Sequence, residues 1–208
     1  MPALDKLCRR FASSTRGIAA VEFAMIVPVL LLLFMASFDA GRAIAAYMKV
    51  RAASFTVAAI SNQYTTSING IQTADMTTIT GSGAAVLSPY CSSVLCPQLV
   101  TKITQVKATS LTAATVSWSY SLNGSAHTAG AAWTLPANFT TQYTAPSGGT
   151  VRGACNSFPC YYLVAEISYT FTPMFGSFVT GPIALADSVY VTPRSSVCVQ
   201  YNNVPSTC

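Results

Sequence analysis

The stretch RGIAAVEFAMIVPVLLLLFMASF, residues Arg16–Phe38, decides the fold of this chain. From Ile18 to Phe38 it has 21 residues, of which only Glu22 is charged. At about 1.5 Å per residue, a helix of this length extends roughly 31 Å, which is enough to cross the hydrocarbon layer of a membrane. The stretch therefore predicts a membrane-spanning helix. It also raises the question of why an acid lies inside it, since an ionised group is costly there.

Basic residues before this helix predict its orientation. Cytoplasmic flanks of membrane helices are enriched in Lys and Arg, so we expect the N-terminus in the cytoplasm and the later residues outside. Further basic residues beyond the helix weaken this bias. A secretory signal peptide also has a basic start, but its apolar core is shorter and lacks an acid. The preceding basic residues are Lys6, Arg9, Arg10 and Arg16, offset by Asp5, and those beyond are Arg42, Lys49 and Arg51.

The helical pattern continues beyond the apolar run. RAIAAYMKVRAASFTVAAISNQY, residues 42–64, contains no Pro or Gly and is rich in alanine, the best helix former. A helix from Ile18 to Gln63 would extend roughly 70 Å and form a stalk. Its alanines would let other helices approach closely, whereas Ile44, Met48, Phe55 and Ile60 would be buried anchors if this part packs on its own domain. We expect both, on different faces.

Beyond residue 60 the composition changes to Ser, Thr, Gly, Asn, Tyr and Val, which suits antiparallel strands and polar turns. ATVSWSYSL and YYLVAEISYTF alternate apolar and polar residues, as half-buried strands of one antiparallel sheet do. We expect a loop-rich segment at 81–98 and a long irregular excursion at 123–153. The predicted strands are Val100–Thr109, Ala114–Leu122, Tyr161–Thr172 and Ile183–Val191.

Seven cysteines lie on the two sides of the predicted membrane helix. Cys8 precedes it and the other six follow it, an even number that an oxidising compartment favours. Other connectivities are open, but we expect sequential pairing, in which each short loop contributes on the order of 2 kcal/mol by the chain-entropy model. The expected pairs are Cys91 with Cys96, Cys155 with Cys160, and Cys198 with Cys208.

The sequence offers little for catalysis or cofactor binding. The one histidine, His127, is expected in a solvent-facing loop, and Glu166 at an exposed strand position. No phosphate-binding loop or paired-carboxylate motif is visible, and the cysteine spacing suits structural zinc poorly. We therefore expect no enzyme activity, no cofactor and no metal. The net charge of +5 is thinly spread outside the N-terminus, so we also expect no nucleic-acid partner.

Two segments carry a family resemblance: GIAAVEF followed by a proline and a leucine run, and then AGRAIAAYMKVRAA. Over about residues 16–60 the chain resembles TadE and TadG-like proteins, the minor pseudopilins of the bacterial tight-adherence (Flp) pilus, with a weaker similarity in YVTPR near the C-terminus. The resemblance implies cleavage by prepilin peptidase after Gly17, which makes Ile18 the new N-terminus and Glu22 the fifth mature residue. Phe23 stands where Flp-type pilins often have tyrosine.

This resemblance suggests a role for Glu22. Cleavage would create a free α-ammonium about four residues away, and the carboxylate would pair with it in the same subunit or in a neighbour. A paired charge costs much less in lipid than a lone one, and the pairing would fix helix register. In the alternative, Glu22 lies at headgroup depth, one turn inside the basic flank, and snorkels or takes a proton.

Together these features predict an α+β protein, with a long N-terminal transmembrane and stalk helix followed by a small antiparallel β-rich, disulfide-bonded periplasmic domain. The expected parts are a basic cytoplasmic leader (1–17), a transmembrane helix (18–40), its periplasmic continuation (41–64) and the β-rich domain (65–208). The resemblance implies a non-catalytic minor pseudopilin of the bacterial inner membrane that could enter the pilus. Its partners would be other pilins and pseudopilins, the membrane assembly platform, prepilin peptidase and membrane lipid. The alternative is an uncleaved, inner-membrane-anchored periplasmic protein that binds the cell envelope or assembly factors.

Overall fold

A computed structural model describes residues 16–64, 70–91, 96–110, 113–136, 158–194 and 196–202. The chain divides into two compact units. The helix unit contains Met1–Ala43 and Thr172–Gly181, and the sheet unit contains Ile44–Phe171 and Pro182–Cys208. The expected leader lies outside the described residues except for Arg16 and Gly17.

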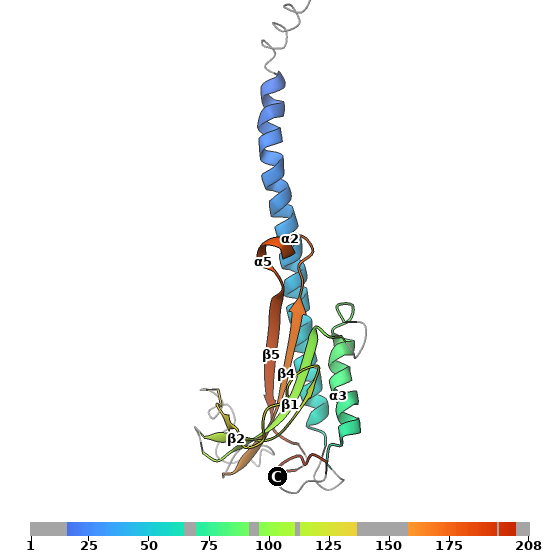
Figure 1. The fold of residues 1–208 in the computed structure, drawn as a ribbon, viewed down its shortest axis with the longest axis vertical. Helices are drawn as coiled ribbons and strands as arrows, with labels where there is room; N and C mark the ends of the chain where they lie inside the picture. Colours follow the sequence, from blue (N-terminus) through green and yellow to red (C-terminus); the bar gives the residue numbers. More distant parts are fainter. Residues whose placement is uncertain are drawn as a thin grey trace, which may run out of the picture. The chain divides into compact units, whose positions relative to one another are not determined.

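Helix α2 spans Arg16–Ser61, 46 residues that contribute to both units (Figure 1). It confirms the long N-terminal apolar helix expected from the sequence. Pro28 lies inside it and lacks an N–H, so one backbone hydrogen bond is missing there, which membrane helices tolerate. At the other end, the helix closes in a turn in which Asn62 N–H donates to the Ala58 carbonyl at 3.1 Å.

Five strands of the sheet unit form one antiparallel sheet in the order β3-β2-β1-β4-β5. This confirms the antiparallel sheet, and four of the strands start and end close to the predicted positions. A register shift between Gln105 and Val106 interrupts the β1–β2 pairing. The strands are β1 (Leu99–Ala108), β2 (Ala114–Leu122), β3 (Ala132–Trp133), β4 (Cys160–Phe171) and β5 (Ile183–Val191).

Two elements differ from the sequence prediction. Helix α3, Thr73–Val86, includes the first part of the segment expected to be a loop, and β3 lies within the expected irregular excursion. The backbone N–H of Gln72 donates to the Asp75 carboxylate at 3.0 Å, so an acid in the first turn supports the start of α3. One of the glycines that suggested a loop, Gly83, instead permits close packing. A Cβ added at Gly83 would lie only 3.2 Å from Val57 Cγ2 and 3.4 Å from Ile167 Cδ1.

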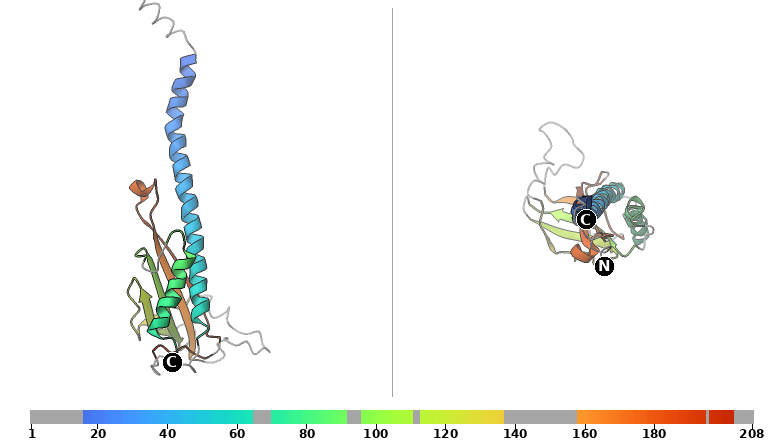
Figure 2. Two further views of the ribbon diagram at one scale, coloured as in Figure 1. Left: turned by 90° about the vertical axis from the view of Figure 1, so that its right-hand side faces the viewer. Right: turned by 90° about the horizontal axis from the view of Figure 1, so that it is seen from above.

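The C-terminal part of α2 and helix α3 lie side by side within the sheet unit (Figure 1 and Figure 2). Small and medium residues of α2 are buried there: Ala46, Val50, Ala53, Ser54, Val57, Ala58 and Ser61. Three of the four expected anchors are wrong, because Ile44, Met48 and Phe55 are 58%, 65% and 52% exposed. The fourth, Ile60, is half-buried. The packed face is therefore the face with small residues.

A second core cluster lies at the β1–β2 and β1–β4 pairings. It consists of Val106, Ala108, Ala114, Cys160, Tyr162 and Val164. Trp133, Leu135 and Tyr190 pack against this cluster and are partly buried. Burial of large aromatic surface contributes strongly to stability, so the short β3 segment has a packing role despite its length.

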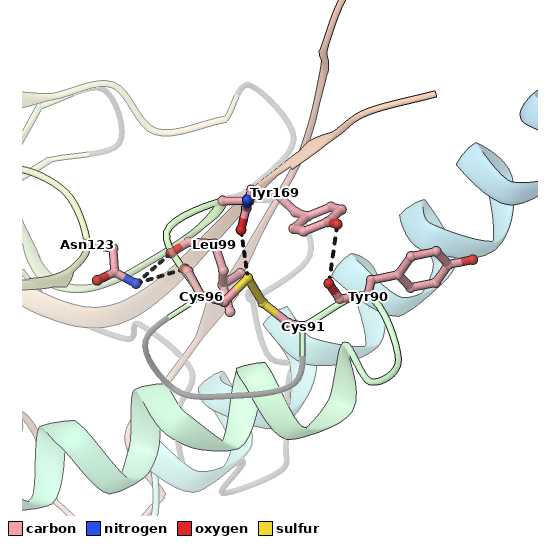
Figure 3. Close-up of a disulfide and its surroundings, with 7 residues drawn as sticks. Tyr90, Cys91, Cys96, Leu99, Asn123 and Tyr169 are labelled. Atoms are coloured by element: carbon pink, nitrogen blue, oxygen red, sulfur yellow. Dashed lines mark hydrogen bonds between the residues drawn. A yellow bond between two sulfur atoms is a disulfide. The ribbon is translucent and has the colours of Figure 1, made fainter. Parts of the chain in front are cut away.

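Cys91 and Cys96 form a disulfide between the end of α3 and the start of β1 (Figure 3). This is one of the three expected pairs. Nearby, the Asn123 side-chain amide donates to the carbonyls of Cys96 and Leu99 at 3.0 and 3.1 Å. Cys160 and Cys198 are also disulfide-bonded. Their expected partners, Cys155 and Cys208, lie outside the described residues, as does Cys8.

Candidate functional site

Residues of the implied cleavage site lie in the first turns of α2. Gly17 and Glu22 are exposed, and a Cβ added at Gly17 would meet no atom within 4 Å. Ile18 belongs to the same helix, although its side chain is not described. Residues four apart lie on one face of a helix, so positions 18 and 22 are neighbours. Glu22 forms no ion pair with any described residue. The structure thus leaves its carboxylate open to a partner, without supplying one.

Large apolar side chains are exposed around the whole N-terminal part of α2. Phe23, Met25 and Phe34 are 66%, 73% and 69% exposed, and the leucine run 30–33 is at least half exposed. Among the described residues, α2 is the one helix long and apolar enough to cross a membrane, and none of its most apolar 18-residue stretch is buried. A helix that is apolar all round needs lipid or other apolar helices as its surroundings.

Asp39, just after the apolar run, forms an unexpected contact within the helix unit. It is only 7% exposed. Its Oδ1 accepts the N–H of Met174 at 2.9 Å, and its Oδ2 accepts those of Phe175 and Gly176 at 2.8 and 2.6 Å. Hydrogen bonds from N–H groups to a carboxylate are stronger than those between neutral groups. The loop that follows β4 is therefore bound to α2 through its backbone.

Two ring contacts accompany these hydrogen bonds. The rings of Phe38 and Phe175 meet edge to face with centroids 5.9 Å apart, and the Arg42 guanidinium lies 5.9 Å from the Phe38 centroid. The sequence did not predict this site. The one signal for it was an acid directly after the apolar run, whose partner is distant in sequence.

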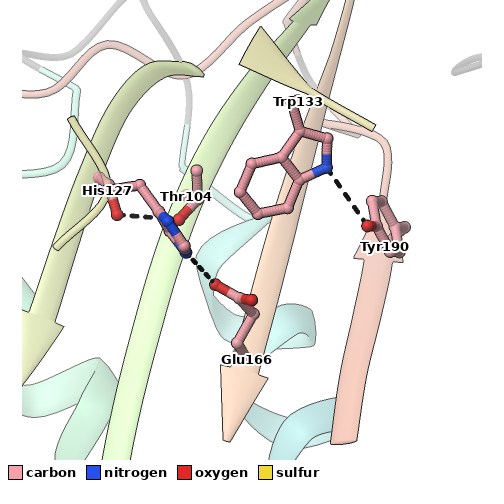
Figure 4. Close-up of polar contacts among 6 residues, drawn as sticks. Thr104, His127, Trp133, Glu166 and Tyr190 are labelled. Atoms are coloured by element: carbon pink, nitrogen blue, oxygen red, sulfur yellow. Dashed lines mark hydrogen bonds and ion pairs between the residues drawn. The ribbon is translucent and has the colours of Figure 1, made fainter. Parts of the chain in front are cut away.

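The side chains of His127 and Glu166 are in hydrogen-bond contact on the sheet, with His127 Nε2 2.7 Å from Glu166 Oε2 (Figure 4). His127 lies in a loop and Glu166 on a strand, as expected, but their side chains are only 31% and 30% exposed, so both are less exposed than the sequence predicts. Trp133 meets the imidazole edge to face at 5.0 Å. No described hydroxyl or thiol hydrogen-bonds to His127, so the geometry does not form a nucleophile–base pair.

Tyr190 joins His127, Glu166 and Trp133 in a polar cluster on the sheet. Trp133 Nε1–H donates to the Tyr190 hydroxyl at 3.3 Å. Burial raises the pKa of Tyr190 above its usual value, the Trp133 hydrogen bond lowers it in part, and the charge of Glu166 raises it further. Tyr190 therefore stays neutral at physiological pH. A groove of about 310 Å³ lies beside the cluster and is lined in part by Lys102, Glu166 and Ser188.

Comparison with known proteins yields one family. Residues 17–59 match the family model described as TadE-like protein. The match covers most of α2, confirms the resemblance found in the sequence and is consistent with a TadE-like protein of the Tad pilus system. Among the curated proteins and the solved structures, none matches the chain significantly.

Proposed function

We propose that this chain is a minor pseudopilin of a Tad (Flp-type) pilus, a structural component without catalytic activity. The observation that carries the proposal is the TadE-like match over residues 17–59, which coincides with a long helix whose most apolar stretch is exposed and long enough to cross a membrane. Such a helix suits membrane anchoring in a pilus system. In the proposed topology, residues 1–17 are a cytoplasmic leader, residues 18–40 cross the inner membrane, and residues 41–64 and 65–208 are periplasmic.

The proposed mechanism has three steps. Prepilin peptidase removes the leader after Gly17, which frees the amine of Ile18. The apolar part of α2 then packs against helices of pilins or other pseudopilins at the membrane assembly platform, and Glu22 pairs with an α-ammonium and fixes the register. Finally, the sheet unit initiates, caps or regulates the fibre. The open surroundings of Gly17 and Glu22 support the first two steps, because both positions are accessible.

Leader cleavage is tested by the mass of the membrane-extracted protein after co-expression with prepilin peptidase. We expect a mature chain that begins at Ile18 from the wild type and an intact chain from a Gly17→Leu variant. Gly41→Leu is the matched control, because a Cβ has open space at both glycines and neither substitution disturbs packing. An intact wild-type chain, or equal cleavage of both variants, would contradict the proposal and support a permanently anchored envelope protein.

Glu22→Gln tests the pairing step separately. We expect leader cleavage to continue but recovery of the mature chain with pilin to fall roughly tenfold, which corresponds to about 1.4 kcal/mol of interaction free energy. The reason is that glutamine cannot pair with an α-ammonium as a carboxylate does. Glu22→Asp keeps the charge and should retain most of the recovery. If the Glu22→Gln chain is cleaved and recovered with pilin as well as the wild type, the proposed charge pairing is contradicted.

A further inference from the structure

Most of the segment between β4 and β5, Thr172–Gly181, has the sequence TPMFGSFVTG and contains no charged residue. We call it the β4–β5 loop; it includes the short helix α5, Ser177–Thr180. Met174, Phe175 and Val179 are 61%, 47% and 84% exposed. An exposed apolar cluster of this kind marks a site of contact with another apolar surface.

Asp39 fixes this loop beside the end of the apolar part of α2. Its carboxylate accepts the N–H groups of three consecutive loop residues, and the Phe38 ring contacts the Phe175 ring. Three further N–H groups, those of residues 179–181, donate to carbonyls within the loop, so six backbone N–H groups have partners while the apolar side chains remain exposed. An unpaired N–H group is costly in an apolar medium, and these hydrogen bonds lower that cost for the loop.

The position of Asp39 along α2 places the loop at a bilayer boundary. Asp39 is ten residues from Val29, so about 15 Å of helix separates it from the middle of the apolar run, half the thickness of the hydrocarbon layer. Arg42, one turn further on, can extend its guanidinium to phosphate groups while its stem and the Phe38 ring stay in apolar surroundings. The side chains of the loop thus lie where acyl chains meet headgroups.

From these contacts we propose that the β4–β5 loop is a lipid-binding element, in which Met174, Phe175 and Val179 insert into the headgroup–acyl boundary of the leaflet where α2 ends. The inference rests on α2 spanning the membrane, and not on leader cleavage or pilus assembly. Lipid is favoured as the partner because the loop is uncharged and is attached at the end of the apolar run. A second insertion beside α2 would fix the depth of the helix in the bilayer.

Tryptophan quenching in lipid nanodiscs tests this inference on the full-length chain. Lipids brominated near the headgroup end of the acyl chain quench shallow indoles, and lipids brominated near the terminal methyl quench deep ones. We would place one added tryptophan in each of three variants, Val179→Trp, Val29→Trp and Val197→Trp. All three sites are exposed, so none of the substitutions disturbs packing, and the wild type gives the baseline from Trp118 and Trp133.

The expected result is that shallow bromines quench the added signal of Val179→Trp about twofold or more, whereas deep bromines act mainly on Val29→Trp. Val197→Trp, in the sheet unit, should match the wild-type baseline with both lipids. Quenching of Val29→Trp without quenching of Val179→Trp would overturn the loop inference and leave the membrane helix intact. Absence of quenching in both would overturn the spanning role of α2 as well.

An aqueous quencher distinguishes lipid from protein as the partner of the loop. If lipid covers the loop, acrylamide should reach the Val179→Trp indole in nanodiscs poorly and the exposed Val197→Trp indole readily. Protection from acrylamide without quenching by brominated lipid would show that a protein surface covers the loop. That outcome would overturn the assignment to lipid.

Discussion

Val57→Asp is expected to unfold the sheet unit. Val57 is fully buried, and its Cγ2 lies 3.2 Å from the point where a Cβ on Gly83 would stand, so α2 and α3 are in direct contact there. An unpaired carboxylate in such a place costs several kcal/mol. One turn earlier on α2, the hydroxyl of Ser54 donates to the Asp187 carboxylate, so the added charge would also be repelled by an acid on the same side. We expect a loss of about 4 kcal/mol or more, comparable with the whole stability of a small domain.

Phe55→Asp is the matched control, because it introduces the same charge two residues away on a half-exposed side chain. Surface substitutions usually change stability by less than about 1 kcal/mol, so this variant should remain folded. The measurement is thermal unfolding of the full-length protein in nanodiscs, followed by near-ultraviolet circular dichroism. Equal destabilisation by the two variants, or a larger effect at Phe55, would show that the face with large residues is the packed one.

The misassigned face of α2 shows what the sequence could not specify. Size suggested Ile44, Met48 and Phe55 as anchors, but the packed face uses Val57 and small residues that let α3 and the sheet approach closely. Alanine and apolar residues occur on every side of the helix, so no polar stripe distinguishes one face from another. The helix itself was predictable from its length and alanine content, but its packed face depended on tertiary contacts.

Strands were predictable for a local reason. β2 alternates apolar and polar residues along its length and β4 does so in its second half, from Glu166 to Phe171, so the period of two was visible there, whereas the first half of β4 is a continuous buried apolar run. Helix α3 was not predictable in the same way, because Gly81 and Gly83 look like loop signals. At Gly83, a Cβ would stand only 3.2 Å from Val57 Cγ2, a close approach that only the folded structure reveals.

The candidate site was partly predictable for a similar reason. Gly17, Ile18 and Glu22 follow a pattern within a few residues of one another, and a family model matches the same region. The contact of Asp39 with Met174 joins residues 135 positions apart, and the His127–Glu166 pair joins residues 39 apart. Both depend on how the strands place their loops, so no short motif could have predicted them.

Residues before the C-terminus are held by contacts within the sheet unit that the sequence also did not predict. Val199 is fully buried, its N–H donates to Gln105 Oε1 at 2.7 Å, and its carbonyl accepts Trp118 Nε1–H at 2.8 Å. The rings of Trp118 and Tyr201 stack with centroids 5.2 Å apart, and residue 201 forms a parallel bridge with Ile71. Trp118 thus joins the sheet to the segment 198–202 through both its ring and its N–H.

Trp118→Ala should therefore cost about 3–5 kcal/mol and release this segment, because it leaves a large cavity and removes the donor to a buried carbonyl. Trp118→Phe is the matched variant: it keeps most of the apolar contact, loses the N–H, and should cost about 1–3 kcal/mol. Hydrogen exchange of the full-length protein in nanodiscs gives the measurement, and the amide of Val199 should lose protection more than those of β4. Unchanged protection at Val199 in the Trp118→Ala variant would mean that Gln105 and the Cys198 disulfide hold the segment without the indole.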